Sequence, residues 1–381
     1  MGTLITPPRN LDAKLFFIIA GEESGDLHGA RLVEEIRQQE SNARFVGHGG
    51  NKMATAGVEI FEPVDKLAVM GFTEVIKHLA YFKKVMRTTV ETIEQLYPTR
   101  IILIDYPGFN LRLARKFFHL GIPVTYFILP QVWAWKEKRV KIIRKYFDQV
   151  LSIFPFEEEW YRKRKVAVRF IGHPFAEQSV AAITQNEFYQ KHGLNTDEKL
   201  LVLFPGSRQQ EVDRHWPVFL QAARKIAQSS NSIRIIVGKA PNVELNPLPD
   251  DILVESDDPR LALRYGQAAL VASGTATLEA AVYDIPAVVA YRFSAPTYYL
   301  ARLMVRLPYA AMVNLIAGKQ VVPELLQNQL TMENLKKAVT PLLNDTNERE
   351  TMLSGYAEVR QALGAPGAYR RAARAILAET Q

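Results

Sequence analysis

Short, wholly apolar runs alternate along the chain with longer segments whose apolar residues recur at helical spacing. In the first half the apolar runs lie within KLFFIIAG, ARFVGHGG, RIILIDYPGFN, PVTYFILP and DQVLSIFPF. Segments such as HGARLVEEIRQQ and VMRTTVETIEQLYP separate these runs and predict amphipathic helices. Strands that are apolar throughout, without alternation, indicate a parallel sheet buried on both faces. The pattern therefore predicts an α/β fold.

The same rhythm restarts after residue 195. The apolar runs of the second half lie within KLLVLFPGSR, IRIIVGK, DILVES and AALVASGTATLEAAVYDIPAVVAY, and RFIGHPFAEQ reads as the connector. We predict two doubly wound, Rossmann-like domains that face each other across a cleft. The expected bounds are 1–172 and 173–351, and the helices from about 352 to 381 are expected to pack back on the first domain.

Composition supports two packed domains and narrows the chemistry. A chain of 381 residues with 48% hydrophobic residues exceeds what one core usually supports. The absence of cysteine excludes disulfides, thiol nucleophiles and cysteine-ligated metals, and the seven histidines lack metal-ligand spacing. No apolar run approaches the roughly 18 residues of a membrane-spanning helix. We expect no bound metal, no cofactor and no transmembrane segment.

The net charge lies entirely in the first half. Residues 1–172 hold 26 Lys and Arg against 19 Asp and Glu, which gives +7, and the remaining residues hold 21 of each. The basic clusters are WKEKRVKIIRK and YRKRKVAVR. Such a half is typical of proteins that bind nucleic acid, an anionic membrane surface or a phosphorylated substrate, and solvated helix faces are an equal alternative.

Two loops of the second half have the features of anion sites. In FPGSR, an apolar strand turns into a helix through Gly206, Ser207 and Arg208, where backbone N–H groups and a guanidinium would meet an anion. An ordinary strand-to-helix turn remains the alternative.

The second of these loops is SGTATLE. Here Ser273, Gly274 and Thr275 precede a helix, and Glu279, one turn later, is placed to accept hydrogen bonds from ribose hydroxyls. A plain helix start explains the stretch equally well. Together the two loops favour a phosphate-bearing nucleotide bound to the second domain.

Three loops of the first half are candidates for the reacting group and its partner. The Gly-rich turn GEESGD contains Ser24 and Gly25, but a tight turn capped by Asp26 is an equal alternative. Asp105 ends an apolar strand, where partial desolvation would raise its pKa toward that of a general base, or where it would cap the next helix.

The third loop is QVWAWKEKR. Its Trp133 and Trp135 alternate, so an extended backbone would point them in opposite directions. One indole would then stack on a sugar or base while the other joins the core. Burial of both in the core remains open.

The motifs, taken in order, resemble those of bacterial lipid-A-disaccharide synthases. They are GEESGD, LAVMGFTEV, DYPGFN, QVWAWKEKR, FIGHP, FPGSRQQEV, SGTATLE and MVNLIAGKQVVPELLQ, and they extend over nearly the whole chain. Glu23 stands where relatives often have Thr, and the extension through Asn10 is a second departure. The resemblance implies a GT-B glycosyltransferase of family 19. Such enzymes join UDP-2,3-diacylglucosamine to 2,3-diacylglucosamine 1-phosphate (lipid X), forming a β(1→6) disaccharide and UDP.

The resemblance also implies roles for individual residues. It makes Asp105 the base, Glu279 the ribose ligand and Asn314 a donor-binding residue, and it places Glu22, with the other residues of its motif, in the acceptor loop. No Asp-x-Asp motif is available to hold a metal on the diphosphate, so Arg208 and the two helix starts would stabilise the departing UDP.

Other functions remain compatible with these residues. A relative with another lipid acceptor, a UDP-sugar 2-epimerase and a nucleotide-binding scaffold without catalysis are the alternatives. A nucleic-acid partner is not expected, since no recognised nucleic-acid motif accompanies the basic half. A homodimer is left open.

Acylated substrates would require access to a membrane. In the segment from Leu67 to Met86, apolar residues at helical spacing, including Val69, Met70 and Phe72, lie among lysines. We expect this segment to dock on the cytoplasmic face of the inner membrane and the protein to be cytoplasmic and peripheral. A core helix would show the same period.

Overall fold

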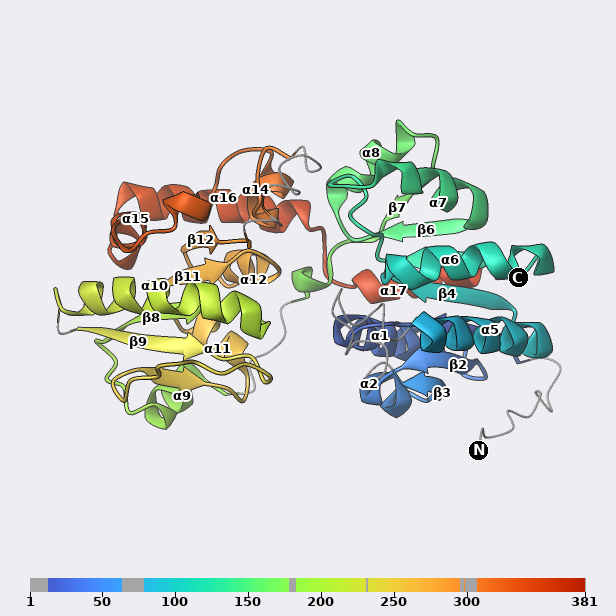
Figure 1. The fold of residues 1–381 in the computed structure, drawn as a ribbon, viewed down its shortest axis with the longest axis horizontal. Coiled ribbons are helices and arrows are strands. Elements are labelled where there is room, and N and C mark those ends of the chain that lie inside the picture. Colours follow the sequence, from blue (N-terminus) through green and yellow to red (C-terminus); the bar gives the residue numbers. More distant parts are fainter. Residues whose placement is uncertain are drawn as a thin grey trace. The chain divides into compact units, whose positions relative to one another are not determined.

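The computed structural model describes residues 13–63, 79–177, 183–230, 232–294, 298 and 307–380. It divides the chain into two compact domains (Figure 1). The first comprises Met1–Pro174 and Ala365–Gln381, and the second comprises Phe175–Gly364. Each is a parallel α/β domain of the Rossmann type.

The first domain is built on a seven-stranded parallel sheet, as counted over the described residues, with the strand order β3-β2-β1-β4-β5-β6-β7. The strands are β1 (Leu15–Ile19), β2 (Arg44–Gly49), β3 (Val58–Pro63), β4 (Arg100–Ile104), β5 (Val124–Phe127), β6 (Gln149–Ser152) and β7 (Arg169–Phe170). The chain order reverses on either side of β1, as expected of a doubly wound sheet.

The helices of the first domain cover both faces of this sheet. They are α1 (Glu23–Gln39), α2 (Asn51–Thr55), α5 (Leu79–Leu96), α6 (Pro107–Phe117), α7 (Val140–Tyr146), α8 (Pro155–Arg162) and α17 (Ala368–Ala378). Leu15, Phe17 and Ile19 of β1 share one core with α5, α6 and α7. Ile104 of β4 points to the opposite face, against α1, which packs beside α17. Both faces of the central strand β1 are therefore apolar and buried, which explains its continuous apolar run in the sequence.

The C-terminal segment joins the first domain through buried polar contacts. Arg100, which is 2% exposed, donates from Nε to Thr380 Oγ1 (2.9 Å) and from Nη1 to Thr125 Oγ1 (3.0 Å). Gln149 Nε2 donates to the carbonyl of Ala375 (2.8 Å). These contacts fix α17 across β4, β5 and β6.

The return to the first domain begins at Ala365, later than the expected residue 352. Helix α16 (Asn347–Ala362) belongs to the second domain, because the Tyr356 hydroxyl accepts the backbone N–H of Ala287 (3.2 Å) and Arg360 donates to the carbonyl of Ala281 (3.0 Å). An amphipathic helix near a domain boundary does not show in its sequence which core it joins.

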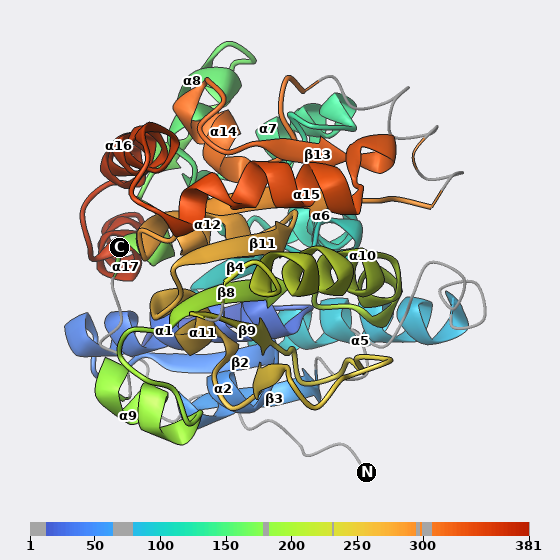
Figure 2. The same ribbon diagram turned by 90° about the vertical axis from the view of Figure 1, so that its left-hand side faces the viewer.

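The second domain, counted in the same described ranges, has a six-stranded parallel sheet in the order β10-β9-β8-β11-β12-β13 (Figure 2). The strands are β8 (Lys199–Phe204), β9 (Ile233–Gly238), β10 (Leu253–Glu255), β11 (Ala268–Ala272), β12 (Ala287–Tyr291) and β13 (Glu324–Leu326). Besides α16, its helices are α9 (Gln185–Lys191), α10 (Gln209–Ala227), α11 (Pro259–Arg264), α12 (Ala276–Val282), α14 (Met312–Ala317) and α15 (Met332–Val339). Among the helices in the described ranges, none combines the length and apolarity needed to cross a bilayer.

Candidate functional site

A pocket of about 500 Å³ lies at the carboxyl ends of β8, β9 and β11 in the second domain. It brings together seven residues that the sequence predicts to bind the donor: Gly206, Ser207, Arg208, Ser273, Gly274, Thr275 and Glu279. Asp258 and Arg260, which the sequence analysis did not single out, line it as well. Both loops with anion-site features thus open into one pocket.

The turn from β8 into α10 requires a glycine. Gly206 has φ +139°, and a Cβ at this position would lie 2.6 Å from the Cβ of Glu211. Arg208 follows in extended conformation as the N-cap residue of α10, and 77% of its side chain is exposed. The guanidinium is therefore free to meet a ligand at the start of a 19-residue helix.

Glu211 covers this helix start. Its carboxylate accepts the backbone N–H of Ser207 (3.2 Å) and the hydroxyl of Tyr291 (2.9 Å) and lies 3.8 Å from Arg208 Nη1. A carboxylate occupies the place where the turn would hold another anion. The sequence alone gives no sign of this role, because Glu211 is an acidic residue in a first helical turn, where such residues are common.

The side chain of His215 holds the turn between β8 and α10 through hydrogen bonds to the backbone. Its Nδ1 lies 2.8 Å from the carbonyl of Pro205, and the backbone N–H of Arg292 donates to Nε2 (2.9 Å). These partners require a proton on Nδ1 and a lone pair on Nε2, so the ring is neutral. Burial accordingly lowers the pKa of His215. A histidine about two helical turns into α10 offered no sequence signal for this role.

The loop from β11 into α12 leaves room beside its backbone. Gly274 has φ +143°, and no atom lies within 4 Å of where its Cβ would be. Glu279 is half-buried, and desolvation raises its pKa, although the nearby Arg260 opposes the shift. Arg260 is itself held by Asp258, with Nε and Oδ1 2.8 Å apart. The pocket thus contains an open backbone loop, three carboxyl groups (Glu211, Asp258 and Glu279) and two guanidinium groups.

Asn314 lies outside this pocket. Its Oδ1 accepts the backbone N–H groups of Val321 (2.7 Å) and Val322 (2.9 Å), and its Nδ2 donates to the carbonyl of Val322 (2.9 Å) and to Glu324 Oε1 (2.8 Å). The side chain is fully buried and its hydrogen-bonding capacity is used within the domain. In this structure Asn314 fixes the loop before β13 and makes no surface available to a donor.

Asp105 lies in the first domain, in the turn that follows β4. Asp105 and Tyr106 both have left-handed backbones, with φ of +41° and +45°. Asn110 Nδ2 (2.8 Å) and the Tyr126 hydroxyl (3.0 Å) both donate to the carbonyl of Asp105. Gly21 lets the Tyr106 ring approach, since a Cβ there would overlap the ring. Two consecutive strained residues held by buried partners are typical of a functional turn.

The environment of Asp105 favours its neutral form. Desolvation raises the pKa of its carboxyl from 3.8 to about 7, the negative charge of Glu22 adds to the shift, and a hydrogen bond from the Tyr106 backbone opposes it. A carboxyl with a pKa near neutrality is matched to accept a proton at physiological pH. The expected strand-end carboxylate is therefore present with the electrostatics of a base.

The GEESGD loop follows β1 on the same sheet edge. Glu22 is the N-cap residue of α1 and is exposed, as is Ser24, whereas Gly25 is buried against Ala20. Asp26 does cap a helix, but that helix is α2. Its carboxylate accepts the backbone N–H groups of Gly50, Lys52 and Met53.

The two tryptophans of the third loop have different surroundings. Trp133 Nε1 donates to Glu157 Oε1 (2.8 Å), and its ring meets Phe156 edge-on at 4.9 Å. Trp135 is 44% exposed, with Lys136 Nζ 3.9 Å above its ring. One indole therefore lies inward and the other outward, although the backbone between them is a turn and not a strand.

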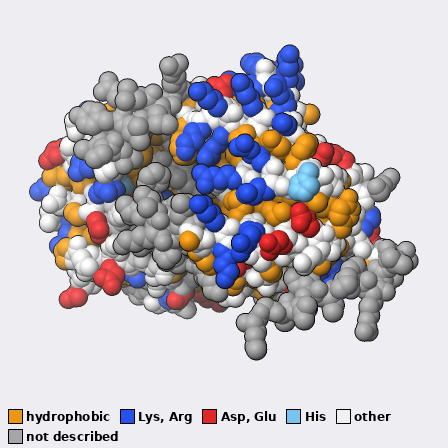
Figure 3. Space-filling model, turned by 45° about the vertical axis from the view of Figure 1, so that its right-hand side comes forward, with side chains coloured by type: hydrophobic (Ala, Val, Ile, Leu, Met, Phe, Trp, Pro, Cys, Tyr) orange, Lys and Arg blue, Asp and Glu red, His pale blue; other side chains and the backbone are white. Residues whose placement is uncertain are grey.

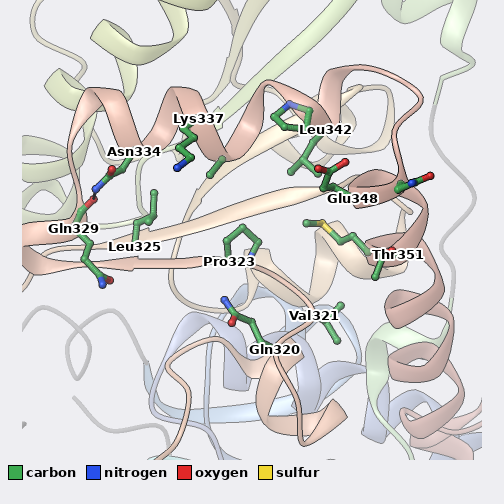
Figure 4. A pocket seen from close by; sticks show the side chains of 14 residues that line it. Gln320, Val321, Pro323, Leu325, Gln329, Asn334, Lys337, Leu342, Glu348 and Thr351 are labelled. Carbon is green, nitrogen blue, oxygen red and sulfur yellow. Dashed lines mark hydrogen bonds between the residues drawn. The ribbon is translucent and has the colours of Figure 1, made fainter.

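A larger pocket of about 980 Å³ lies elsewhere in the second domain, among β13, α15 and α16. Figure 4 shows Pro323 and Val321 on one wall and Lys337 and Leu342 on the other. The lining contains one lysine and no arginine, and none of the residues that the sequence predicted. Within the described ranges, no group of three or more His, Asp or Glu side chains is arranged to hold a metal ion.

Comparisons with known proteins agree across the whole chain. The model of the lipid-A-disaccharide synthetase family matches residues 16–378. The lipid-A-disaccharide synthase of Myxococcus xanthus is 38% identical over 98% of both chains. That of Coxiella burnetii (strain RSA 331 / Henzerling II) is 35% identical over 95% of this chain and 98% of its own.

Solved structures share the fold at lower identity. The calicheamicin glycosyltransferase CalG4 has a TM-score of 0.59 at 16% identity, over 96% of this chain and 97% of its own. The UDP-GlcNAc 2-epimerase of Neisseria meningitidis has a TM-score of 0.59 at 11% identity, over 97% of this chain and 99% of its own.

The raised pKa of Asp105 gives its stability contribution a defined pH dependence. Because the folded pKa of about 7 exceeds the unfolded value of 3.8, the contribution is full below pH 3.8, falls as pH rises toward 7 and is absent above. Asp105→Asn tolerates the left-handed backbone and cannot ionise. As the pH rises from 4 to 8, the free energy of unfolding of the variant should increase relative to that of the parent by about 2 to 4 kcal/mol. Thermal unfolding at each pH measures this difference. A stability difference that does not change with pH would contradict this.

Proposed function

Because the chain belongs to the lipid-A-disaccharide synthase family, we propose that it transfers a diacylglucosamine unit from UDP-2,3-diacylglucosamine to 2,3-diacylglucosamine 1-phosphate. The acceptor 6-hydroxyl would attack the anomeric carbon opposite the α-linked UDP. The product is the β(1→6) disaccharide 1-phosphate, with UDP as the leaving group. This inverting reaction needs one base and a stabiliser for the developing negative charge on UDP.

The observation that carries the proposal is the strained Asp105 turn at the carboxyl edge of the first sheet. In the proposed reaction, Asp105 takes the proton of the 6-hydroxyl as the new bond forms. Its carboxyl is half-buried, and its pKa of about 7 allows it to accept a proton and then release it to water. Asn110 and Tyr126 hold the backbone and leave the carboxylate itself for the substrate.

The pocket of the second domain is the proposed donor site. Arg208 and the first turn of α10 would bind the diphosphate, and Glu279 would accept from the ribose hydroxyls. Binding in this arrangement displaces Glu211 from the N–H of Ser207, because both anions need the same donor. Arg208 would then carry the charge that develops as the bond to UDP breaks.

A UDP-sugar 2-epimerase and a transferase with another lipid acceptor are the competing functions. The epimerase shares this fold, and fold alone does not decide between them. Incubation with UDP-GlcNAc alone separates the two classes, since only an epimerase would form the 2-epimer. Labelled UDP-diacylglucosamine with a panel of acceptors separates the transferases.

We also propose that the first domain docks on the cytoplasmic face of the inner membrane, where acylated substrates reside. The residues Val69, Met70 and Phe72 of the expected docking segment lie outside the described residues. Of the part that is described, Phe82 packs against the domain core, while Lys83, Lys84 and Arg87 are exposed. The described end of the docking segment, from residue 79 onward, therefore exposes cationic side chains to the solvent.

A second basic surface of the first domain supports this docking. Figure 3 shows Lys and Arg side chains gathered on one face. A hollow of about 880 Å³ is lined by eight cations and one acid: Lys136, Lys138, Arg139, Lys141, Arg144, Lys163, Arg164, Lys165 and Glu137, with Val140. Desolvation, followed by the neighbouring charges of Arg139 and Arg112, lowers the pKa of Lys136. Such a surface attracts anionic headgroups.

Asp105→Asn tests the proposed base. We expect transfer to fall by about 10² or more, because a positioned base contributes at least that factor. UDP affinity, measured by calorimetry, should stay unchanged, since the donor site lies in the other domain. The exposed Asp197→Asn serves as the matched control and should behave as the parent. Near-normal transfer in Asp105→Asn would remove Asp105 from the mechanism.

Arg208→Ala tests the proposed donor site. Loss of a charged hydrogen bond should weaken UDP binding by about 1.5 to 3 kcal/mol. Arg208→Lys should recover only part of this, because an ammonium group lacks the planar fork of donors. Lys225→Ala, at the far end of the same helix, is the control for a lost surface charge. Unchanged UDP affinity in the Ala variant would refute this role.

Sedimentation with anionic liposomes tests the membrane surface. Replacing Lys138, Lys141 and Lys163 by Gln should weaken binding by about 10²-fold at low salt, at roughly 1 kcal/mol per cation. Replacing Val69, Met70 and Phe72 by Ser should remove the part of the binding that resists high salt. If both variants fold, bind UDP and sediment as the parent does at either salt concentration, the docking proposal fails.

A further inference from the structure

Glu157 is a buried carboxyl group that the proposed reaction does not yet use. It lies in the first turn of α8 and is fully buried. Its Oε1 accepts the indole Nε1–H of Trp133 (2.8 Å), and its Oε2 accepts the hydroxyl of Ser152 in a short hydrogen bond. Both carboxylate oxygens are therefore occupied by side chains from two other elements.

The environment of this carboxyl resembles that of Asp105. Among the described residues, no cation forms an ion pair with Glu157. Burial raises its pKa to about 7, hydrogen bonds from Ser152, Trp133 and Phe154 oppose the shift, and the charge of Asp105 adds to it. A buried carboxyl without a cationic partner costs stability when it ionises, and here only hydrogen bonds offset that cost.

Trp133 depends on this carboxyl for its orientation. The indole is only partly buried, and Phe156 touches it edge-on at 4.9 Å, so its ring is not enclosed by the core. The Nε1–H, its one polar group, points to Glu157. Removing the carboxylate would leave the ring free to rotate about its side-chain bonds.

Trp133 and Asp105 belong to the same edge of the sheet. The loop that carries Trp133 leaves β5, which pairs with β4, and Asp105 directly follows β4. The backbone N–H of Asp105 donates to the carbonyl of Phe127 (3.0 Å), and the Tyr126 hydroxyl donates to the carbonyl of Asp105 (3.0 Å). The ends of both strands are therefore fixed to each other.

We infer that Glu157 is a positioning residue, which holds the indole of Trp133 as one wall of the acceptor sugar's binding site beside Asp105. This inference rests on the proposed function. An indole face offers apolar surface to the C–H groups of a sugar, and a fixed wall orients the 6-hydroxyl toward the base. Glu157 touches neither the substrate nor the reacting atoms and acts through Trp133.

The first test needs no substrate. In protein labelled with ¹⁵N-tryptophan, the indole Nε1–H signal of Trp133 is assigned by its loss in Trp133→Phe. We expect this signal to shift with pH around 7 in the parent and in the exposed control Glu158→Gln, and to show no such titration in Glu157→Gln. A Trp133 signal with the same position and pH course in Glu157→Gln as in the parent would overturn the inference.

The second test separates positioning from a structural role. Glu157→Ala should raise the acceptor KM about tenfold, because small misplacements of a positioning group carry large kinetic costs, and should leave UDP affinity unchanged. Glu157→Gln, whose amide oxygen still accepts from the indole, should restore most of the acceptor KM. Trp133→Ala should match Glu157→Ala, and the double variant should be no worse than Trp133→Ala. Additive effects, or a loss of UDP affinity, would overturn the inference.

The pH profile supplies a third readout. Besides each other, the titratable groups that interact with Asp105 and Glu157 are Glu22, Tyr126 and Tyr161, and the backbone of Tyr106 donates to Asp105. Loss of a negative neighbour lowers the pKa of Asp105, so the acid limb of transfer should move to lower pH in Glu157→Gln. An unmoved limb would count against the inference. Failure of the parent to form disaccharide would instead refute the proposed function. The indole titration needs no substrate, so it would still test the contact between Glu157 and Trp133.

Discussion

All strands in the described parts of the chain run parallel to their sheet neighbours, and the candidate sites depend on this constraint. In a parallel sheet all carboxyl ends meet at one edge, and the chain must leave each strand there through a loop. The loops after β1, β4 and β5 are therefore neighbours in the first domain, as are those after β8, β9 and β11 in the second. Residues far apart in the sequence are brought together by strand direction alone.

This constraint is the reason why much of the fold and part of the site were accessible from the sequence. Apolar runs marked the buried strands, and the loops that follow these runs marked the carboxyl edge of each sheet. Asp105 and the FPGSR and SGTATLE loops were found in this way, and the structure brings both loops into one pocket. The two-domain division followed from the repeat of the same rhythm.

The residues that were missed act through partners distant in the sequence. Glu157 and His215 carry no signal of their own, because their contacts with Trp133 and with Arg292 form only in the folded chain. Asn314 shows the reverse problem. A motif drew attention to it, but its amide is used to hold the loop before β13. The helix α16 posed the same difficulty, since its apolar face would suit either core.

The return of α17 to the first sheet makes the second domain an insertion within the first. Residues 175–364 form a complete α/β domain, whereas the sheet of the first domain lacks one of its covering helices until residues 365–380 are available. During synthesis the second domain can therefore finish folding before Thr380 is available to accept the hydrogen bond from Arg100. The first domain, which carries the basic surface, can therefore complete the cover of its sheet only when residues 365–380 have been synthesised.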